Sequence, residues 1–311
     1  MDINRLKQNL LMKKILFKHS LLPVFFGLCL LLVSCTDSVA PIYQGPDIQI
    51  LQQTGHKDLE AQFQRYSYKL DALEQGVPPL ILTAMPADLG DIHSSKKRKT
   101  IFFKALLPMI LLANEEIRFE RYQVQKTQQH LENFGKLSPD QRHILATLAQ
   151  RYEVDYDPAS PEKTVERLLK RVDIIPADLA LAQAANESAW GTSRFSRVAN
   201  NLFGEWTFIQ GQGIVPEGRP EGETYEIQKF PTVYDSVKSY LHNLNTHPAY
   251  RQLRTIRAEI RSAGSKPSGV VLAEGLLRYS IRGMDYVREL QAMIRKNRLE
   301  RFAGAKLRVS T

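Results

Sequence analysis

The chain has 311 residues, a formal net charge of +9, 43% hydrophobic residues and only two cysteines. This length suits one large or two modest domains, and a mean hydropathy of −0.30 with ordinary charge content argues against a disordered chain or a polytopic membrane protein. Two cysteines are too few for a disulfide scaffold or a cysteine-based zinc cluster. The positive charge invites a nucleic-acid interpretation, which depends on where the charges lie.

Much of the excess positive charge is N-terminal. Residues 1–34 carry five Lys or Arg side chains against one Asp, and the apolar run Leu21–Val33 follows the last of these basic residues. This run is shorter than the ~20 residues that a membrane-spanning helix needs, so it predicts an export signal. It ends in Leu32-Val33-Ser34-Cys35, which resembles a bacterial lipobox and predicts cleavage that makes Cys35 the lipid-bearing first residue. An uncleaved signal anchor is the alternative, and Met12 is an alternative start.

The export signal predicts a lipoprotein of the cell envelope that faces the periplasm. Thr36 after Cys35 favours the outer membrane in a host with two membranes. Export argues against DNA binding, so we expect no nucleic-acid partner and interpret the basic cluster at 96–99 as a solvated helix start. Protein partners cannot be inferred from these residues.

The chain then divides by composition. Residues 35–60 are rich in Pro, Gln and Gly and predict a tether, and prolines break 61–99 into an irregular arm. From 100 to 305 the pattern is that of a mostly helical domain, beginning with the apolar stretch Ile101–Ala113. Because Lys104 and Pro108 interrupt this stretch, we expect a buried, kinked helix rather than a second membrane span.

Further start signals follow along the chain. Ser138-Pro139-Asp140-Gln141 has the form of a capping box, and Ser160-Pro161-Glu162 opens a helix through Arg171. After a helix from Pro176, residues 204–235 change to short strands broken by Gly and Pro, before helical patterns resume from Asp235. The predicted fold class is α+β, mostly helical, with a small β-lobe inserted between helices.

The helix from Pro176 carries a candidate acid, Glu187, in its last turn before Gly191. Small residues share the face of Glu187, so little bulk separates it from a groove. The negative end of the helix dipole and partial burial beside Trp190 both favour a raised pKa, which a general acid needs to protonate a glycosidic oxygen. A surface ion pair between Glu187 and Arg194 or Arg197 is the alternative.

Two longer motifs surround this glutamate. The segments 182–193 (AQAANESAWGTS) and 199–204 (ANNLFG) resemble the signature of bacterial N-acetylglucosaminidases of glycoside hydrolase family 73, which includes autolysins and flagellar muramidases. The segment 229–236 (KFPTVYDS) is similar to the family's step out of its β-lobe, and the resemblance spans about 165–300. With the lipobox, the chain resembles the Bax-type envelope branch of this family.

The resemblance implies a lysozyme-like helical lobe with a small β-hairpin lobe over the cleft. It implies a peptidoglycan hydrolase, an endo-β-N-acetylglucosaminidase that cleaves glycan strands after N-acetylglucosamine and needs no cofactor or metal. Glu187 matches the acid of the family and Tyr234 its active-site tyrosine. Three residues match positions that shape the floor of the cleft: Trp190, Asn201 and Phe203.

The second carboxylate is less defined, because 211–228 departs from the usual lobe. Spacing from Phe230 favours Glu217 as the second catalytic group, followed by Glu223, which we also predict to contact substrate. Glu221 and Glu226 are alternatives, and any of these four carboxylates could instead be solvated hairpin charge. Glu205, at a position where the family has an apolar residue, is a further candidate. A water attack assisted by the acetamido group of the substrate is also compatible.

Aromatic residues support a sugar site independently. Residues 187–250 hold 10 aromatic side chains among 64, against 9% in the whole chain, and flat rings such as Trp206 suit the apolar faces of pyranoses. The seven histidines are scattered without a His-Glu-x-x-His motif, so no metal site is expected. Two other functions remain open: a lytic transglycosylase with the same Glu-Ser motif, and a non-catalytic murein-binding or scaffolding lipoprotein.

Overall fold

The computed structural model describes residues 45–52 and 55–308, which all belong to one unit of the chain. The predicted signal peptide and Cys35 lie outside the described residues. The helices of the described part are α2 (His56–Arg65), α3 (Ser95–Phe134), α4 (Pro139–Arg151), α5 (Pro161–Arg171), α6 (Ala177–Glu187), α7 (Arg194–Val198), α8 (Val233–Thr246), α9 (Arg251–Ser262), α10 (Gly269–Leu272) and α11 (Met284–Lys296). The strands are β1 (Gln49–Leu51), β2 (Leu80–Leu82), β3 (Trp206–Thr207), β4 (Gly213–Ile214) and β5 (Glu226–Gln228).

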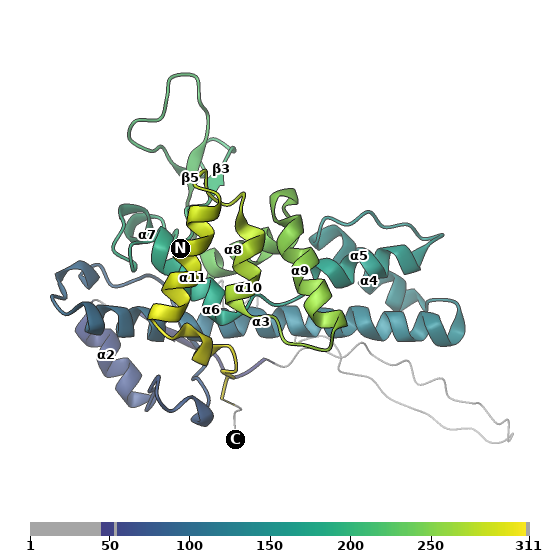
Figure 1. Cartoon of the computed structure of the whole chain (residues 1–311), viewed down its shortest axis with the longest axis horizontal. Helices are drawn as coiled ribbons and strands as arrows, with labels where there is room; N and C mark the ends of the chain where they lie inside the picture. Colours follow the sequence, from purple (N-terminus) through teal and green to yellow (C-terminus); the bar gives the residue numbers. More distant parts are fainter. Residues whose placement is uncertain (1–44, 53–54, 309–311) are drawn as a thin grey trace, which may run out of the picture. The chain divides into compact units, whose positions relative to one another are not determined.

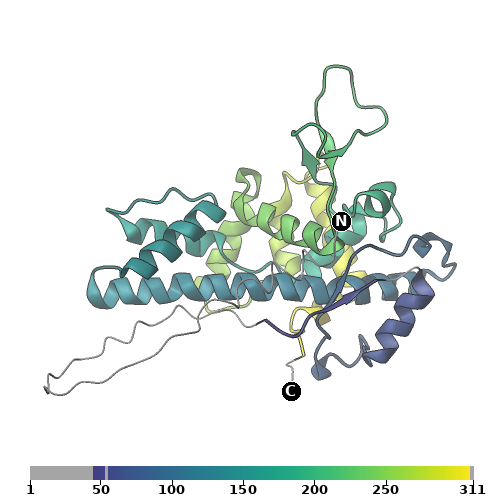
Figure 2. The same ribbon diagram turned by 180° about the vertical axis from the view of Figure 1, so that it is seen from behind.

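The 40-residue helix α3 is the element on which the other helices pack. Its apolar stretch Ile101–Ala113 is buried except for Lys104, and Pro108 lies inside it. The second half becomes amphipathic and contacts α4 and α5, and Gly135 in the left-handed conformation ends the helix. In Figure 1 α3 runs along one side of α6, α8 and α9, and Figure 2 shows the same arrangement from behind. No helix among the described residues is long and apolar enough to cross a membrane.

Local signals position the helices that follow. The predicted capping box at Ser138 is confirmed, since its hydroxyl accepts from the Gln141 backbone while the Gln141 side chain accepts from the Ser138 backbone. Helix α5 runs from Pro161 to Arg171 as predicted. A second capping box, between Thr232 and Asp235, starts α8 where the chain leaves the β-lobe.

Helix α6 is the central element of the site and is buried along nearly its whole length. It contacts α3, α10 and α11, and its alanines let these neighbours approach closely. The helix ends at Glu187, and not near Gly191 as the sequence suggested. The physical reason is a turn of three successive left-handed residues, Ala189, Trp190 and Gly191, that directly follows the helix.

The β-lobe is a three-stranded antiparallel sheet in the order β3-β5-β4. It lies between α7 and α8 in the chain and projects from the side of the helices opposite α3 (Figure 1). Together with the helical lobe it confirms the predicted fold class, an α+β chain that is mostly helical with a small β-lobe.

The N-terminal region has more regular structure than the predicted tether and irregular arm. Strand β1 pairs in parallel with β2. Helix α2, which lies between these strands in the sequence, packs on α3. Val77 bridges to Leu307 near the other end of the chain, and Arg308 donates to the backbone of Tyr66 and Gly76. These contacts join segments far apart in sequence, so local periodicity at 45–99 carries little trace of them.

Candidate active site

The turn after α6 is held by the Glu-Ser motif itself. The Ser188 hydroxyl donates to the Ala184 carbonyl (2.5 Å) and accepts from the Gly191 backbone N–H (2.8 Å). Ala189 and Trp190 have φ of 48° and 62°, a region that costs a non-glycine residue about 1 kcal/mol or more. Two strained residues directly after a candidate acid indicate a turn whose shape is needed at the site.

Gly191 fits this turn because it has no side chain. Its φ is +79°, and a Cβ there would lie 3.2 Å from both Leu89 and Met85 of the N-terminal region. The region predicted as an irregular arm therefore packs directly against the turn that carries Glu187.

Glu187 is half-buried at the C-terminal end of α6. Tyr286 of α11 donates a hydrogen bond to its Oε1 (2.8 Å). Burial raises the pKa of Glu187, and the hydrogen bond from Tyr286 offsets part of that rise. The alternative of a surface ion pair is not found in the part of the chain that the structure describes, where Glu187 pairs with neither Arg194 nor Arg197 and Arg194 pairs with Glu217 (2.9 Å).

A chain of hydrogen bonds orients this carboxyl. Tyr240 donates to Gln183 Oε1 (2.6 Å), Gln183 Nε2 donates to the Tyr286 hydroxyl (3.0 Å), and Tyr286 donates to Glu187. Gln183 lies one helical turn before Glu187 on α6, and the side chains of Gln183 and Tyr240 are fully buried. Every donor in the chain points toward Glu187, so the network holds Oε1 as an acceptor.

The second carboxylate oxygen faces Gly204. A Cβ built on Gly204 would lie 4.0 Å from Glu187 Oε2, and Gly204 itself is exposed with φ of +68°. Asn201 shapes this loop, since its Oδ1 accepts from the Glu205 N–H while its Nδ2 donates to the carbonyls of Glu205 and Gln228. Oε2 is thus the oxygen of Glu187 on which a transferable proton can be held.

Glu205 has a buried carboxyl with one partner. Ser239 donates to its Oε2 (2.8 Å), and within the described residues its buried Oε1 has no hydrogen-bond partner. Burial raises the pKa of Glu205 to about 7. At acidic pH this carboxyl keeps its proton, so it cannot act there as a base.

The β-lobe carboxylates differ in their surroundings. Glu217 is exposed and paired with Arg194 of α7, and Glu223 is exposed on the same loop. Glu226 is buried and accepts from the backbone N–H groups of Gly211 and Gly213, which hold its pKa below the usual range. The Glu226 side chain of β5 therefore holds the backbone at the start of β4 against β5.

The predicted aromatic residues occupy three different settings. Trp190 packs edge-on against Phe102 and Phe103 of α3 with the Lys99 ammonium 4.4 Å from its ring. The Tyr234 hydroxyl donates to Glu116 of α3 (2.9 Å).

Phe203 lies in the buried part of the site, whereas Trp206 is exposed on the β-lobe. Phe203 is buried and its ring stacks on that of Tyr240 at 3.9 Å. It therefore packs against the first donor of the hydrogen-bond chain that leads to Glu187. Trp206 is 57% exposed and stacks on Tyr225 at 4.5 Å, which presents a flat aromatic face on the β-lobe. Phe203 and Asn201 therefore lie beside Gly204, in the loop that faces Glu187. Trp190 and Tyr234 instead contact side chains of α3.

Sequence reasoning missed the residues that orient Glu187. Gln183 and Tyr286 contact it or its partners, and Tyr279 stacks on Tyr286 at 5.4 Å while donating to the Phe203 carbonyl. Among residues 45–52 and 55–308 no group of three or more His, Cys, Asp or Glu side chains could hold a metal ion.

Comparisons with known proteins identify the family of the chain. Residues 162–299 match the Glucosaminidase family model, described as mannosyl-glycoprotein endo-beta-N-acetylglucosaminidase. The chain is 36% identical to Protein bax of Escherichia coli (strain K12) over 211 residues. These aligned residues make up 68% of this chain and 73% of that protein. No solved structure gives a significant match. The chain therefore belongs to the glucosaminidase family of glycoside hydrolases, in its Bax-type branch.

Proposed function

We propose that this protein is an endo-β-N-acetylglucosaminidase that cleaves the glycan strands of peptidoglycan after N-acetylglucosamine, with Glu187 as the general acid. The observation that carries the proposal is the asymmetric environment of one carboxyl. Oε1 of Glu187 accepts from Tyr286, while Oε2 faces the exposed Gly204.

This arrangement suits proton donation. Burial raises the pKa of Glu187 and so favours its neutral form, and the hydrogen bond that Oε1 accepts from Tyr286 leaves Oε2 to carry the proton. The acid transfers that proton to the glycosidic oxygen as the bond to the anomeric carbon breaks. The strained turn at Ala189 and Trp190 and the buried Gln183 keep the carboxyl in position.

The test uses purified sacculi and the full chain beside its Glu187→Gln form. The proposal predicts new reducing-end N-acetylglucosamine by mass spectrometry, and a loss of at least about 100-fold for Glu187→Gln, which keeps the size of the side chain. Anhydro-muramyl ends indicate a lytic transglycosylase, and binding without release indicates a scaffold. Full activity of Glu187→Gln refutes the assignment of the acid.

The second catalytic group is tested separately. Glu217 remains the first candidate and Glu223 the next, and the exposed Glu259 of α9, outside the β-lobe, provides a matched control. A loss of about 100-fold in Glu217→Gln or in Glu223→Gln, with activity retained in Glu259→Gln, supports the carboxylate that was replaced. Activity retained in both β-lobe variants favours assistance by the acetamido group of the substrate.

We further propose a lipid anchor at Cys35 and an envelope location for the protein. The support is the charged stretch, the short apolar run and the lipobox-like Leu32-Val33-Ser34-Cys35. Metabolic labelling with a fatty-acid analogue tests this, since Cys35→Ala abolishes labelling if the anchor is present.

A further inference from the structure

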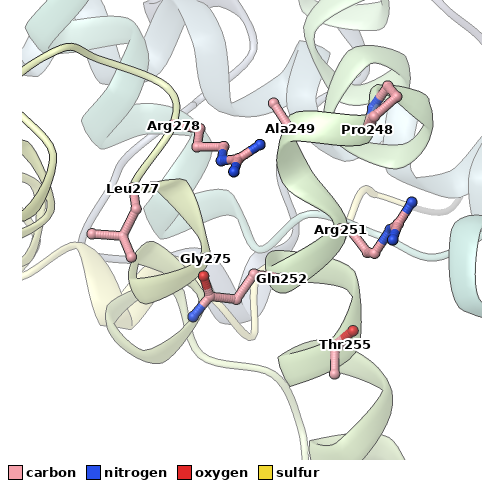
Figure 3. A pocket seen from close by; sticks show the side chains of 8 residues that line it. All are labelled: Pro248, Ala249, Arg251, Gln252, Thr255, Gly275, Leu277 and Arg278. Carbon is pink, nitrogen blue, oxygen red and sulfur yellow. The ribbon is translucent and has the colours of Figure 1, made fainter.

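A pocket of about 600 Å³ lies between the start of α9 and the segment that precedes α11. Two arginines line it, Arg251 from α9 and Arg278 from the segment after the 3₁₀ turn Ala273–Leu276. Figure 3 shows the Arg278 side chain directed across the pocket toward Ala249, with Arg251 on the opposite side.

The two guanidinium groups carry uncompensated charge. Both arginines are exposed, and within residues 45–52 and 55–308 neither has an ion pair or a side-chain hydrogen bond. None of the eight residues around the pocket is acidic. Since unpaired arginines bind carboxylate and phosphate groups in bidentate fashion, the pocket is suited to an anionic ligand.

The other lining groups narrow the ligand class. Gln252 and Thr255 offer an amide and a hydroxyl, which pair with peptide groups, and Ala249 and Leu277 offer small apolar contacts of the size of a methyl group. Arg251 and Thr255 also line an adjoining hollow of about 410 Å³, whose other charged side chains are four basic residues and two acidic ones: Arg167, Lys170, Arg171, Arg254, Glu153 and Asp155. A short peptide with methyl side chains and several carboxylates fits this lining better than a phosphate polymer does, because the polymer has neither amides nor methyl side chains.

The pocket adjoins the candidate active site through two aromatic rings. Tyr250 follows the pocket residue Ala249, Tyr279 follows Arg278, and the two rings lie 5.8 Å apart. Tyr279 stacks on Tyr286, which contacts Glu187. A series of packed rings thus joins the lining of the pocket to the tyrosine that contacts Glu187.

We propose that this pocket binds the carboxylate-bearing peptide stem of peptidoglycan and so selects glycan strands that still carry their stems. The proposal rests on the proposed function for its substrate class. The Arg278 guanidinium pairs with one stem carboxylate, Arg251 with the next, and the amide of Gln252 with the peptide backbone between them.

Binding is tested directly with the tripeptide L-alanyl-γ-D-glutamyl-diaminopimelate and the full chain, by titration calorimetry. We expect Arg278→Gln and Arg251→Gln each to weaken binding by about threefold to tenfold, the range of an exposed to partly buried charge pair. Arg295→Gln, an exposed arginine outside the pocket lining, is the matched control and binds as the parent does. Equal binding by all four proteins overturns the proposal, and so does a higher affinity for inorganic phosphate than for the tripeptide.

Kinetics give an independent readout. The quantity measured is kcat/KM on stem-bearing strands divided by kcat/KM on strands stripped of stems by an amidase. We expect this ratio to fall in both pocket variants through a higher KM and to stay unchanged in Arg295→Gln. An unchanged ratio in the pocket variants refutes stem selection while hydrolysis stands. If the parent cleaves neither strand, the proposed function fails, and the calorimetry still decides the pocket.

Discussion

The buried carboxyl of Glu205 makes the stability of this protein depend on pH. Its pKa is raised by burial from an ordinary 4.5 to about 7. In the unfolded chain the group ionises near 4.5, so between pH 4.5 and 7 the folded state holds a proton that the unfolded state has lost. The free energy of unfolding therefore falls as pH rises through this window, and the loss is complete above about pH 7.

The magnitude follows from the two pKa values. At 1.36 kcal/mol per pH unit, the penalty reaches about 3 kcal/mol at pH 8 and is below about 1 kcal/mol at pH 5. Glu205→Gln replaces the carboxyl by a neutral group of the same shape that still accepts from Ser239. We expect this variant to be more stable than the parent by about 2–3 kcal/mol at pH 8 and nearly equal to it at pH 5.

The assay is urea unfolding at pH 5 and pH 8, followed by the fluorescence of the two tryptophans, Trp190 and Trp206. Glu217→Gln is the matched control, because Glu217 lies exposed in the same β-lobe. The reasoning is refuted if the stability difference between Glu205→Gln and the parent is the same at both pH values, or if the control shows the same pH-dependent gain.

Three further predictions concern the acid, the turn and the lobe. Tyr286→Phe removes the hydrogen bond that lowers the pKa of Glu187. The alkaline limb of the pH–rate profile should therefore move to higher pH, and kcat should fall by about tenfold. An alkaline limb at the same pH as in the parent contradicts this prediction. Gly191→Ala should cost about 2–3 kcal/mol in urea unfolding from a left-handed φ and a crowded Cβ, whereas Gly218→Ala, equally left-handed with open space around it, should cost only about 1 kcal/mol. Trp206→Ala should raise KM on glycan strands by about tenfold with little change in kcat, and an unchanged KM would exclude it as a sugar platform.

The elements that could be predicted are those whose causes lie within a few residues of one another. The capping box at Ser138, the proline at the start of α5 and the apolar run within α3 all act through neighbours one helical turn away. The motif around Glu187 is likewise contiguous, so the candidate acid and the fold class could be read from the chain.

The prediction fell short where distant segments meet. Helix α2 and the parallel pair β1 and β2 lie in stretches predicted as tether and arm, because their stability comes from packing on α3 and on the C-terminal residues. Parallel pairing of short strands leaves no local sequence signal of its own.

The sequence by itself determined the catalytic candidate Glu187 and the mostly helical fold with its β-lobe, since both depend on residue types at short spacing. The tertiary structure alone decided which groups act on that glutamate. Tyr286 lies 99 residues away and reaches Glu187 only because α11 packs against α6. The carboxyl of Glu205 loses water only when the loop around Asn201 closes on α8. Burial and long-range hydrogen bonds exist only in the folded chain, and they set the pKa values on which the proposed chemistry depends.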